Sequence, residues 1–141
     1  MQKIRAMSIK DYAKVIKLWQ STEGMGINDY DDSRKCIKRF LQMNPKTCFV
    51  VEQNDKEIIG TILGGFDGRR GLIYHLMVKP EYRNNGLGKK LLEKAENGFK
   101  KRGVMRIYIV IFSNNTRGNK FWEDNGYEFR DFLKFMSKKL F

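Results

Sequence analysis

The N-terminal third of the chain alternates briefly and then takes up helical periodicity. Residues 2–7 alternate polar and apolar positions, which predicts a short first strand. Ser8 opens a capping-box pattern, with an acidic residue three positions later, and apolar residues then recur at helical spacing as far as Trp19. A second amphipathic helix is predicted to begin at the polar residues 31–33 and to end before Pro45, because the residue before a proline disfavours helical geometry.

The middle of the chain changes to the short apolar segments typical of strands. Turn-forming residues separate these segments at Asn54-Asp55 and at 67–71, so we expect an antiparallel meander. The three predicted strands are residues 48–51, 58–63 and 72–78.

Helical and strand-like patterns alternate in the remainder of the chain. Residues 86–102 have an apolar side and predict a helix, which Gly103 ends. The apolar run 105–112 predicts a buried strand, parallel to the strand before the helix. A short helix over 116–125 and a final strand or bent pair of strands over 128–140 complete the order β-α-α-β-β-β-α-β-α-β(β). The fold class is therefore α/β, with a mixed central sheet flanked by helices.

Length and composition fit a single domain that spans residues 1–141. A chain of this length buries roughly two-thirds of its unfolded surface, so it needs no disulfide or metal to stabilise it. Cys36 and Cys48 lack CxxC spacing and are expected to be reduced, and a single histidine argues against a zinc site. A metal site made of carboxylates alone remains an alternative. No signal-peptide core or membrane-length apolar run is present, so a cytoplasmic location away from membranes is predicted.

The net charge is strongly positive, with 28 Lys and Arg against 16 Asp and Glu, a formal charge of +12. Such an excess suggests a polyanionic partner, either nucleic acid, acidic lipid or a phosphorylated cofactor. A generally cationic and soluble surface explains the charge equally well. Nucleic acid is the least favoured partner, because the basic residues are spread along the chain without a recognition motif. A homodimer is compatible with the sequence.

The segment between the third meander strand and the next helix carries the clearest chemistry. Residues 78–88 follow the pattern Val-x-Pro-x-x-Arg-x-x-Gly-x-Gly, and the helix then begins without an acidic cap. Two glycines permit a tight turn and leave backbone N–H groups unobstructed, so the helix start is suited to an anion such as a pyrophosphate. The alternative is an ordinary glycine-containing turn, and the pattern is neither a Walker loop nor a Rossmann fingerprint.

Two motifs of this sequence resemble those of the GNAT superfamily of N-acetyltransferases. Residues 78–88 resemble the acetyl-CoA pyrophosphate loop of that family. A second block, with Asn115, Gly118, Trp122 and Gly126-Tyr127, resembles its segment Asn-x-x-Ala/Gly-x-x-x-Tyr-x-x-x-Gly-Phe. The predicted element order is also that of the family, so the resemblance covers essentially the whole chain and implies a GNAT-like mixed sheet.

The resemblance implies that acetyl-CoA binds along these two segments as co-substrate. Backbone groups of the strand before the loop would hydrogen-bond the pantetheine amides, and the loop would hold the pyrophosphate. The second block would wall the pantetheine arm, although core packing is an equal alternative for Phe121. The implied residues are Leu76, Met77 and Val78, then Arg83, Asn84, Asn85, Gly86, Leu87, Gly88 and Lys89, and finally Asn115, Phe121 and Trp122.

The catalytic groups are predicted less sharply. An alkylamine with a pKa near ~10 is mostly protonated at neutral pH, so a base, or a water chain leading to one, is expected. Tyr74, His75, Glu23 and Asp67 are candidates, and the alternative for Asp67 is that it forms a turn with Gly68. A hydrogen-bonded histidine within a sheet and an exposed charge at a helix end are the alternatives for His75 and Glu23. Neighbouring strand residues point to opposite faces, so Tyr74 and His75 share a face only if a bulge intervenes.

The family's usual proton donor to the departing thiolate is missing from its usual place. Many members have a tyrosine seven residues after the asparagine, where this sequence has Trp122, and an indole cannot act as an acid. Tyr127 is a substitute donor. The resemblance implies an N-acetyltransferase that acts on a primary amine of a small molecule or peptide, by direct attack in a ternary complex. The alternative is a non-catalytic coenzyme A-binding regulatory module on the same fold.

Overall fold

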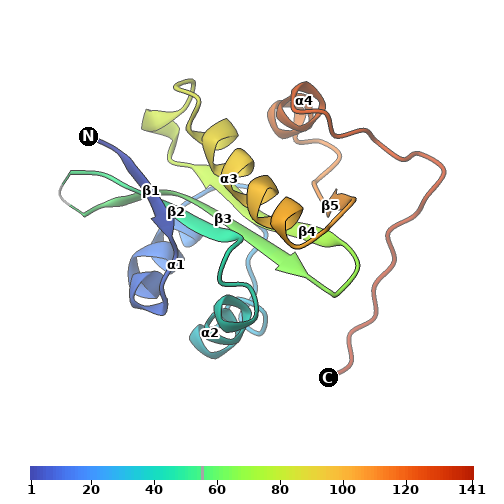
Figure 1. Cartoon of the computed structure of the whole chain (residues 1–141), viewed down its shortest axis with the longest axis horizontal. Coiled ribbons are helices and arrows are strands. Elements are labelled where there is room, and N and C mark those ends of the chain that lie inside the picture. The colour runs from blue at the N-terminus through green and yellow to red at the C-terminus, as the bar shows by residue number, and fades with distance from the viewer. Residues whose placement is uncertain (55) are drawn as a thin grey trace. The chain divides into compact units, whose positions relative to one another are not determined.

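The structure, a computed structural model, describes residues 1–54 and 56–141 (Figure 1). Its chain forms two compact units, Met1–Val110 and Ile111–Phe141, and each is described by itself. The elements are β1 (Lys3–Ala6), the 3₁₀ turn η1 (Ile9–Asp11), α1 (Tyr12–Gln20), α2 (Arg34–Met43), β2 (Cys48–Glu52), β3 (Ile58–Phe66), β4 (Gly71–Val78), the 3₁₀ turn η2 (Pro80–Tyr82), α3 (Leu87–Lys101), β5 (Ile107–Ile109) and α4 (Thr116–Asp124).

A five-stranded mixed sheet, in the order β1-β2-β3-β4-β5, is the framework of the first unit. The predicted meander is confirmed, because β2, β3 and β4 pair antiparallel in sequence order and β1 pairs antiparallel with β2. The predicted crossover is confirmed as well, because β4 and β5 are parallel neighbours joined through α3. The segment that joins the end of β4 to the start of α3 is the one in which the sequence predicted an anion site.

Helices cover both faces of this sheet, with α1 and α2 on one side and α3 on the other (Figure 1). A side chain at Gly64 of β3 would meet Phe99 of α3. One at the neighbouring Gly65 would meet Phe40 of α2, as expected for strand residues that point to opposite faces. The core under α1 and α2 consists of Met7, Val15, Leu18, Trp19, Ile37, Leu41, Cys48, Val50, Ile58, Leu63 and Met77.

The helix starts follow the capping residues that the sequence indicated. The Ser8 hydroxyl accepts a hydrogen bond from a backbone N–H of the following turn, and the Asp11 carboxylate accepts one from the Ser8 N–H, which completes the capping box. Ser33 caps α2 by accepting from the Cys36 N–H, and the helix ends at Asn44 before the proline. These local signals positioned the two helices correctly.

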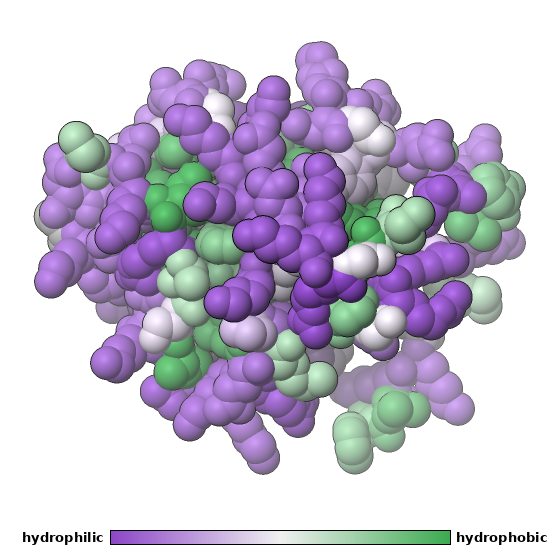
Figure 2. Space-filling view, in the orientation of Figure 1, coloured by the Kyte–Doolittle hydropathy of each residue, from purple (hydrophilic) through white to green (hydrophobic). Residues whose placement is uncertain are grey.

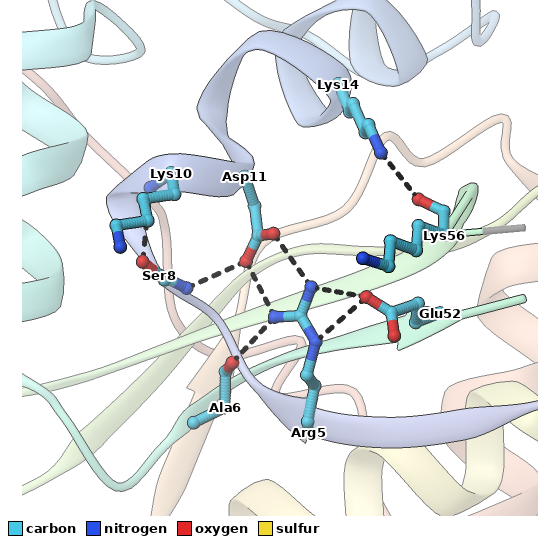
Figure 3. A network of polar contacts seen from close by, with 8 residues as sticks. All are labelled: Arg5, Ala6, Ser8, Lys10, Asp11, Lys14, Glu52 and Lys56. Atoms are coloured by element: carbon cyan, nitrogen blue, oxygen red, sulfur yellow. Dashed lines mark hydrogen bonds and ion pairs between the residues drawn. The ribbon is translucent and has the colours of Figure 1, made fainter.

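Arg5 on β1 ties the first strand to the η1 turn and to β2 (Figure 3). Its guanidinium donates two hydrogen bonds of 2.9 Å to the Asp11 carboxylate and two, of 2.8 and 3.2 Å, to Glu52. Burial of Asp11 opposes its ionisation, but the hydrogen bonds from Arg5 and from the Ser8 N–H outweigh burial and lower the pKa of this carboxyl. The side chains of Arg5, Asp11 and Glu52 therefore form a charged network that connects β1 with η1 and β2.

The predicted buried strand at residues 105–112 is wrong in both length and burial. Only Ile107–Ile109 is a strand, and its residues are half-buried. On either side, Met105 is 95% exposed and Phe112 is 59% exposed. β5 is the edge of the described sheet, and it pairs only with Gly71–Ile73 of β4. An apolar run indicates that a segment is suited to burial. How many of its residues are buried depends on the elements that pack beside it.

The predicted final strand or pair of strands is also not found. The structure has no strand in residues 128–141, where Phe129, Phe132 and Phe135 are all more than two-thirds exposed. A strand requires a neighbouring strand that exchanges backbone hydrogen bonds with it. Loose alternation of apolar side chains does not by itself provide such a neighbouring strand.

The turn predicted at Asn54-Asp55 includes a residue outside the described ranges. Within residues 1–54 and 56–141, no helix combines the length and the apolar character needed to cross a bilayer. On the face shown in Figure 2, hydrophilic residues cover most of the surface, with apolar residues scattered among them.

Candidate active site

A β-bulge interrupts β4 where it pairs with β3. The register runs from Leu63 opposite Tyr74 to Thr61 opposite Met77. Two residues of β4, 75–76, therefore lie opposite the single residue between Thr61 and Leu63 on β3. Such a bulge bends the strand and redirects the side chain that it carries.

The bulge is held by hydrogen bonds that reach across the sheet. His75 has a φ of +49°, in the left-handed region that most side chains avoid. Its carbonyl accepts a 2.8 Å hydrogen bond from the Thr61 hydroxyl, which in turn accepts one of 2.9 Å from the Trp19 indole. Thr61 and Trp19 are completely buried, so this chain of donors keeps His75 in its unusual conformation.

Tyr74 and His75 both contact the helices on the α1 and α2 face of the sheet. The Tyr74 ring lies edge-on to Phe40 of α2, with centroids 5.9 Å apart. The His75 ring lies 4.5 Å from the ring of Trp19 in α1. The bulge that sequence reasoning required for the two side chains to share a face is present.

His75 is paired with a buried carboxylate. Its Nε2 lies 2.8 Å from Oδ1 of Asp32, whose side chain is 6% exposed, and Oδ2 of Asp32 accepts a 3.0 Å hydrogen bond from the Asn28 N–H. Burial alone would raise the pKa of the Asp32 carboxyl, but the hydrogen bonds from His75 and Asn28 outweigh it and lower the pKa. The backbone of Asp32 is held too, because its carbonyl accepts from the Tyr12 hydroxyl at 2.7 Å.

The pairing of Asp32 was not predicted from the sequence. Residues 31–33 were expected only to begin the second helix, and within them Ser33 is the cap. The partner of Asp32 lies 43 positions away, and no local pattern indicates such a pair.

The second half of β4 has a strand neighbour on only one side. β5 pairs with Gly71–Ile73 and ends there, so residues 74–78 have a ladder partner only in β3 among the described strands. The Val78 carbonyl accepts a 2.7 Å hydrogen bond from Nε of Arg83, which anchors the following loop to the strand. Part of the edge predicted to hold pantetheine, at Leu76 and Met77, is thus open toward the β5 side.

The loop after β4 presents backbone N–H groups at the start of α3. Gly86 is the N-cap, with a φ of +78° and no side-chain cap. The first helical hydrogen bond runs from the Lys90 N–H to the Gly86 carbonyl at 3.0 Å, so the N–H groups of residues 87–89 have no acceptor within the helix. Asn84 also has a positive φ, of 65°. The Leu87 side chain is buried.

In the second unit, Asn115 caps α4. Its Oδ1 accepts a 2.9 Å hydrogen bond from the Gly118 N–H. A side chain at Gly118 would lie 2.7 Å from both the Asn115 amide nitrogen and the Ile111 side chain. The second motif therefore needs a glycine at position 118 for a structural reason, because a larger residue would clash with the Asn115 cap and with Ile111.

The aromatic residues of the second motif pack on one another. The Trp122 ring lies edge-on to Phe121 at 5.4 Å and to Tyr127 at 4.8 Å. Tyr127 therefore belongs to the same aromatic cluster as Trp122. Of the other candidates, Glu23 is exposed in the loop between α1 and α2, and Asp67 accepts hydrogen bonds from two N–H groups of its own turn, as a turn former does.

Comparison with known proteins identifies the family. The model of the Acetyltransferase (GNAT) family matches residues 12–127, most of the chain. The chain belongs to the GNAT acetyltransferase family. An acetyltransferase, SG1711 of Sodalis glossinidius, is 31% identical over 137 residues, which cover 97% of this chain and 94% of that protein. The resemblance of the two sequence motifs to this family is thereby confirmed, and the family uses acetyl-CoA as its co-substrate.

Solved structures share the fold. A GNAT-family acetyltransferase from Staphylococcus aureus superposes with a TM-score of 0.81 at 20% identity, covering 95% of this chain and 90% of its own. The PaiA N-acetyltransferase of Thermoplasma acidophilum, solved in complex with coenzyme A, superposes with a TM-score of 0.76 at 22% identity, covering 91% and 90%. The predicted α/β class with a GNAT-like mixed sheet flanked by helices is confirmed.

Proposed function

We propose that this protein is an N-acetyltransferase that transfers the acetyl group of acetyl-CoA to a primary amine. The observation that carries the proposal is the start of α3, where backbone N–H groups without helical acceptors follow a strand with an open edge. Oriented N–H groups and the positive end of the helix dipole favour a pyrophosphate, and an open strand edge favours the extended amides of pantetheine. The net charge of +12 adds general attraction for a ligand with three phosphate groups.

The proposed cofactor residues divide by the kind of group that each offers. Leu76, Met77 and Val78 offer backbone, as do Asn84, Asn85, Gly86, Leu87, Gly88 and Lys89, while Arg83 and the Lys89 side chain add charge, and Asn115, Phe121 and Trp122 belong to the second motif.

Direct attack balances without a covalent enzyme intermediate. The amine nitrogen forms a bond to the thioester carbonyl carbon, the carbon–sulfur bond breaks, and coenzyme A leaves as a thiolate that takes up a proton. A thiol has a pKa near ~8.5, so the thiolate departs without full protonation. A hydrogen bond from Trp122 or Tyr127 would then be sufficient assistance, and no general acid is required at position 122.

A thermal shift experiment tests the cofactor site. Acetyl-CoA at about a hundredfold excess over Kd should stabilise the folded chain by about 2.7 kcal/mol, which corresponds to a rise in Tm of roughly 5–10 °C. Gly86→Leu should abolish the rise, because a side chain there obstructs the approach of phosphate to the backbone. Gly103→Leu is the matched control, since Gly103 has a φ of +79° near the other end of α3 and open space around it.

The outcomes are distinct. If both variants lose the same basal stability and only Gly86→Leu loses the response to acetyl-CoA, the site is as proposed. If millimolar acetyl-CoA does not raise the Tm of the native chain, the proposal is wrong. Thiol release with polyamines, aminoglycosides, amino acids and peptide N-termini then separates an enzyme from a coenzyme A-binding regulatory module, because only the enzyme turns over.

A further inference from the structure

We propose that Asp32 and His75 form a proton-accepting pair in which Nδ1 of His75 takes the proton of the attacking amine and Asp32 is the positioning residue. This inference rests on the proposed function and names the base that the reaction needs. It assigns a role to the buried carboxylate that sequence reasoning had not connected with the reaction.

The carboxylate determines which nitrogen of His75 is the base. An ionised carboxylate only accepts hydrogen bonds, so at 2.8 Å from Asp32 Oδ1 the Nε2 atom must carry hydrogen. In the neutral ring the lone pair is then on Nδ1. No hydrogen bond reaches Nδ1 from the residues that the structure describes, so this atom is available to an external donor. Proton uptake makes an imidazolium, which the adjacent carboxylate stabilises.

Several contacts hold the pair in place before a substrate arrives. The ring of His75 packs against buried Trp19, and the His75 carbonyl is fixed by Thr61. Asp32 is fixed on its own side, since Asn28 donates to its second carboxylate oxygen and Tyr12 donates to its carbonyl. A base held in this way loses little freedom on reaction, which is the condition for efficient proton transfer.

The pair lies at a suitable place on β4. The bulge at residues 75–76 begins two positions after Ile73, the last residue of β4 paired with β5, so His75 lies in the stretch of β4 that has no partner in β5. The His75 side chain is 13% exposed, and the adjacent Tyr74 is 43% exposed on the same face. The side chain is thus shielded from bulk water yet reachable.

The other candidates are less suitable as bases. Burial and the nearby charge of Asp31 raise the pKa of Tyr74, so its hydroxyl stays protonated at neutral pH. Glu23 is exposed in the loop between α1 and α2, and none of the hydrogen bonds described above holds its carboxylate in place. Tyr127 packs on Trp122 in the second unit and fits the role of hydrogen-bond donor.

The proton balance of the step is simple. The neutral amine attacks the carbonyl carbon, its excess proton moves to Nδ1 of His75, and the thiolate of coenzyme A leaves. The imidazolium then returns to neutral by giving its proton to solvent or to the thiolate. The net change converts the amine and acetyl-CoA into the amide and the free thiol, and no further reactant is needed.

Charged and titratable residues of α1, of α2 and of the segment before α2 interact with the pair or with its neighbours. Tyr12 of α1 donates to the Asp32 backbone, and its pKa is raised by its own burial and by Asp32. Among the described residues, the charge of Asp31 acts on Tyr74 and the charge of Arg34 of α2 acts on Tyr12. A pH profile should therefore be compared with variants at these positions before it is assigned to His75.

Nuclear magnetic resonance tests the tautomer without any substrate. His75 is the only histidine of the chain, so a tag-free ¹⁵N-labelled sample gives one imidazole. We expect the neutral ring to carry hydrogen on Nε2 and the Asp32→Asn variant to lose this preference, because an amide can also donate. A native ring protonated on Nδ1 when neutral would overturn the proposal.

Kinetics test the chemistry. Asp32→Asn and His75→Asn should lower kcat about 10²- to 10⁴-fold, with the KM for acetyl-CoA changed less than about threefold. Asparagine tolerates the positive φ at position 75, which favours folding of that variant. The double variant should be no slower than the slower single one, because the two residues act as a unit. The dependence of kcat on pH should also differ between His75→Asn and the native chain, a change that a purely structural role would not produce.

Asp31→Asn is the matched control, because it removes the same charge one position away. Among the described residues, the Asp31 carboxylate accepts a side-chain hydrogen bond only from the Asn28 amide. Its kcat should stay within about threefold of native. The acetyl-CoA thermal shift, measured for every variant, distinguishes the two proposals. A retained shift with native kcat in Asp32→Asn and His75→Asn overturns this inference alone, whereas no shift in the native chain overturns the proposed function.

Discussion

Removing the guanidinium of Arg5 should destabilise the fold and leave a recognisable pH signature. Arg5→Met keeps the length of the side chain and deletes four hydrogen bonds to the carboxylates of Asp11 and Glu52. Asp11 would stay buried with the Ser8 N–H as a remaining partner. The variant thus tests whether the network of Figure 3 stabilises the first strand against the rest of the sheet.

The expected loss follows from the burial of the groups. Breaking a fully buried pair costs about 3–5 kcal/mol, and an exposed pair contributes about 0–1 kcal/mol. Here the Asp11 side chain is 11% exposed and Arg5 is 28% exposed, so the network lies between these limits but nearer the buried one. We expect a loss of about 2–3 kcal/mol in the free energy of unfolding at pH 7, a fall in Tm of roughly 6–12 °C for a chain of this size.

The pH dependence has a definite sign. The pKa of folded Asp11 is lowered, so its contribution to stability is present above the unfolded value near ~3.9 and is lost as pH falls through the folded value. The difference between native chain and Arg5→Met should therefore be full at pH 7 and shrink below about pH 4, where Asp11 becomes protonated.

Urea unfolding followed by circular dichroism at several pH values measures this difference. Lys3→Met is the control, because Lys3 is an exposed cation on the same strand and its loss should change stability by at most about 0.5 kcal/mol. If Arg5→Met is no less stable than Lys3→Met at pH 7, or if the difference does not shrink on acidification, the account of the network is wrong.

Two further predictions concern single residues. Burial raises the pKa of the Cys48 thiol to about 12, so in Ellman's assay at pH 8 only Cys36 should react in the folded chain and Cys48 only after denaturation; two rapidly reacting thiols would contradict this. Trp122→Phe keeps the edge-on packing against Phe121 and Tyr127 and loses only the indole N–H, so kcat should fall at most about tenfold; a hundredfold fall at unchanged KM would make the indole part of the chemistry.

Local signals in the sequence predicted most of the elements and one half of the candidate site. The capping box at Ser8, the cap at Ser33 and the glycine at position 86 each act on backbone groups a few positions away. Such effects depend on neighbouring residues alone, so they can be read without a fold. The start of α3, which is the proposed anion site, belongs to this class.

The extent of strands was decided by their neighbours. Residues 105–112 and 128–140 have the apolar character of strands, but only Ile107–Ile109 pairs in the structure. Pairing depends on which backbone edge lies alongside, and that is a property of the assembled sheet.

The sequence by itself determined the α/β class, the element order up to α4, the meander and the glycine loop proposed to bind an anion, because periodicity and caps are local. Only the tertiary structure decided the bulge at His75, because it arises from the register of two strands. It alone also brought Asp32 to His75 across 43 positions and placed Thr61 and Trp19 behind them. The pairing of a carboxylate with an imidazole requires the packing of helices on a sheet, and no pattern along the chain encodes that distance.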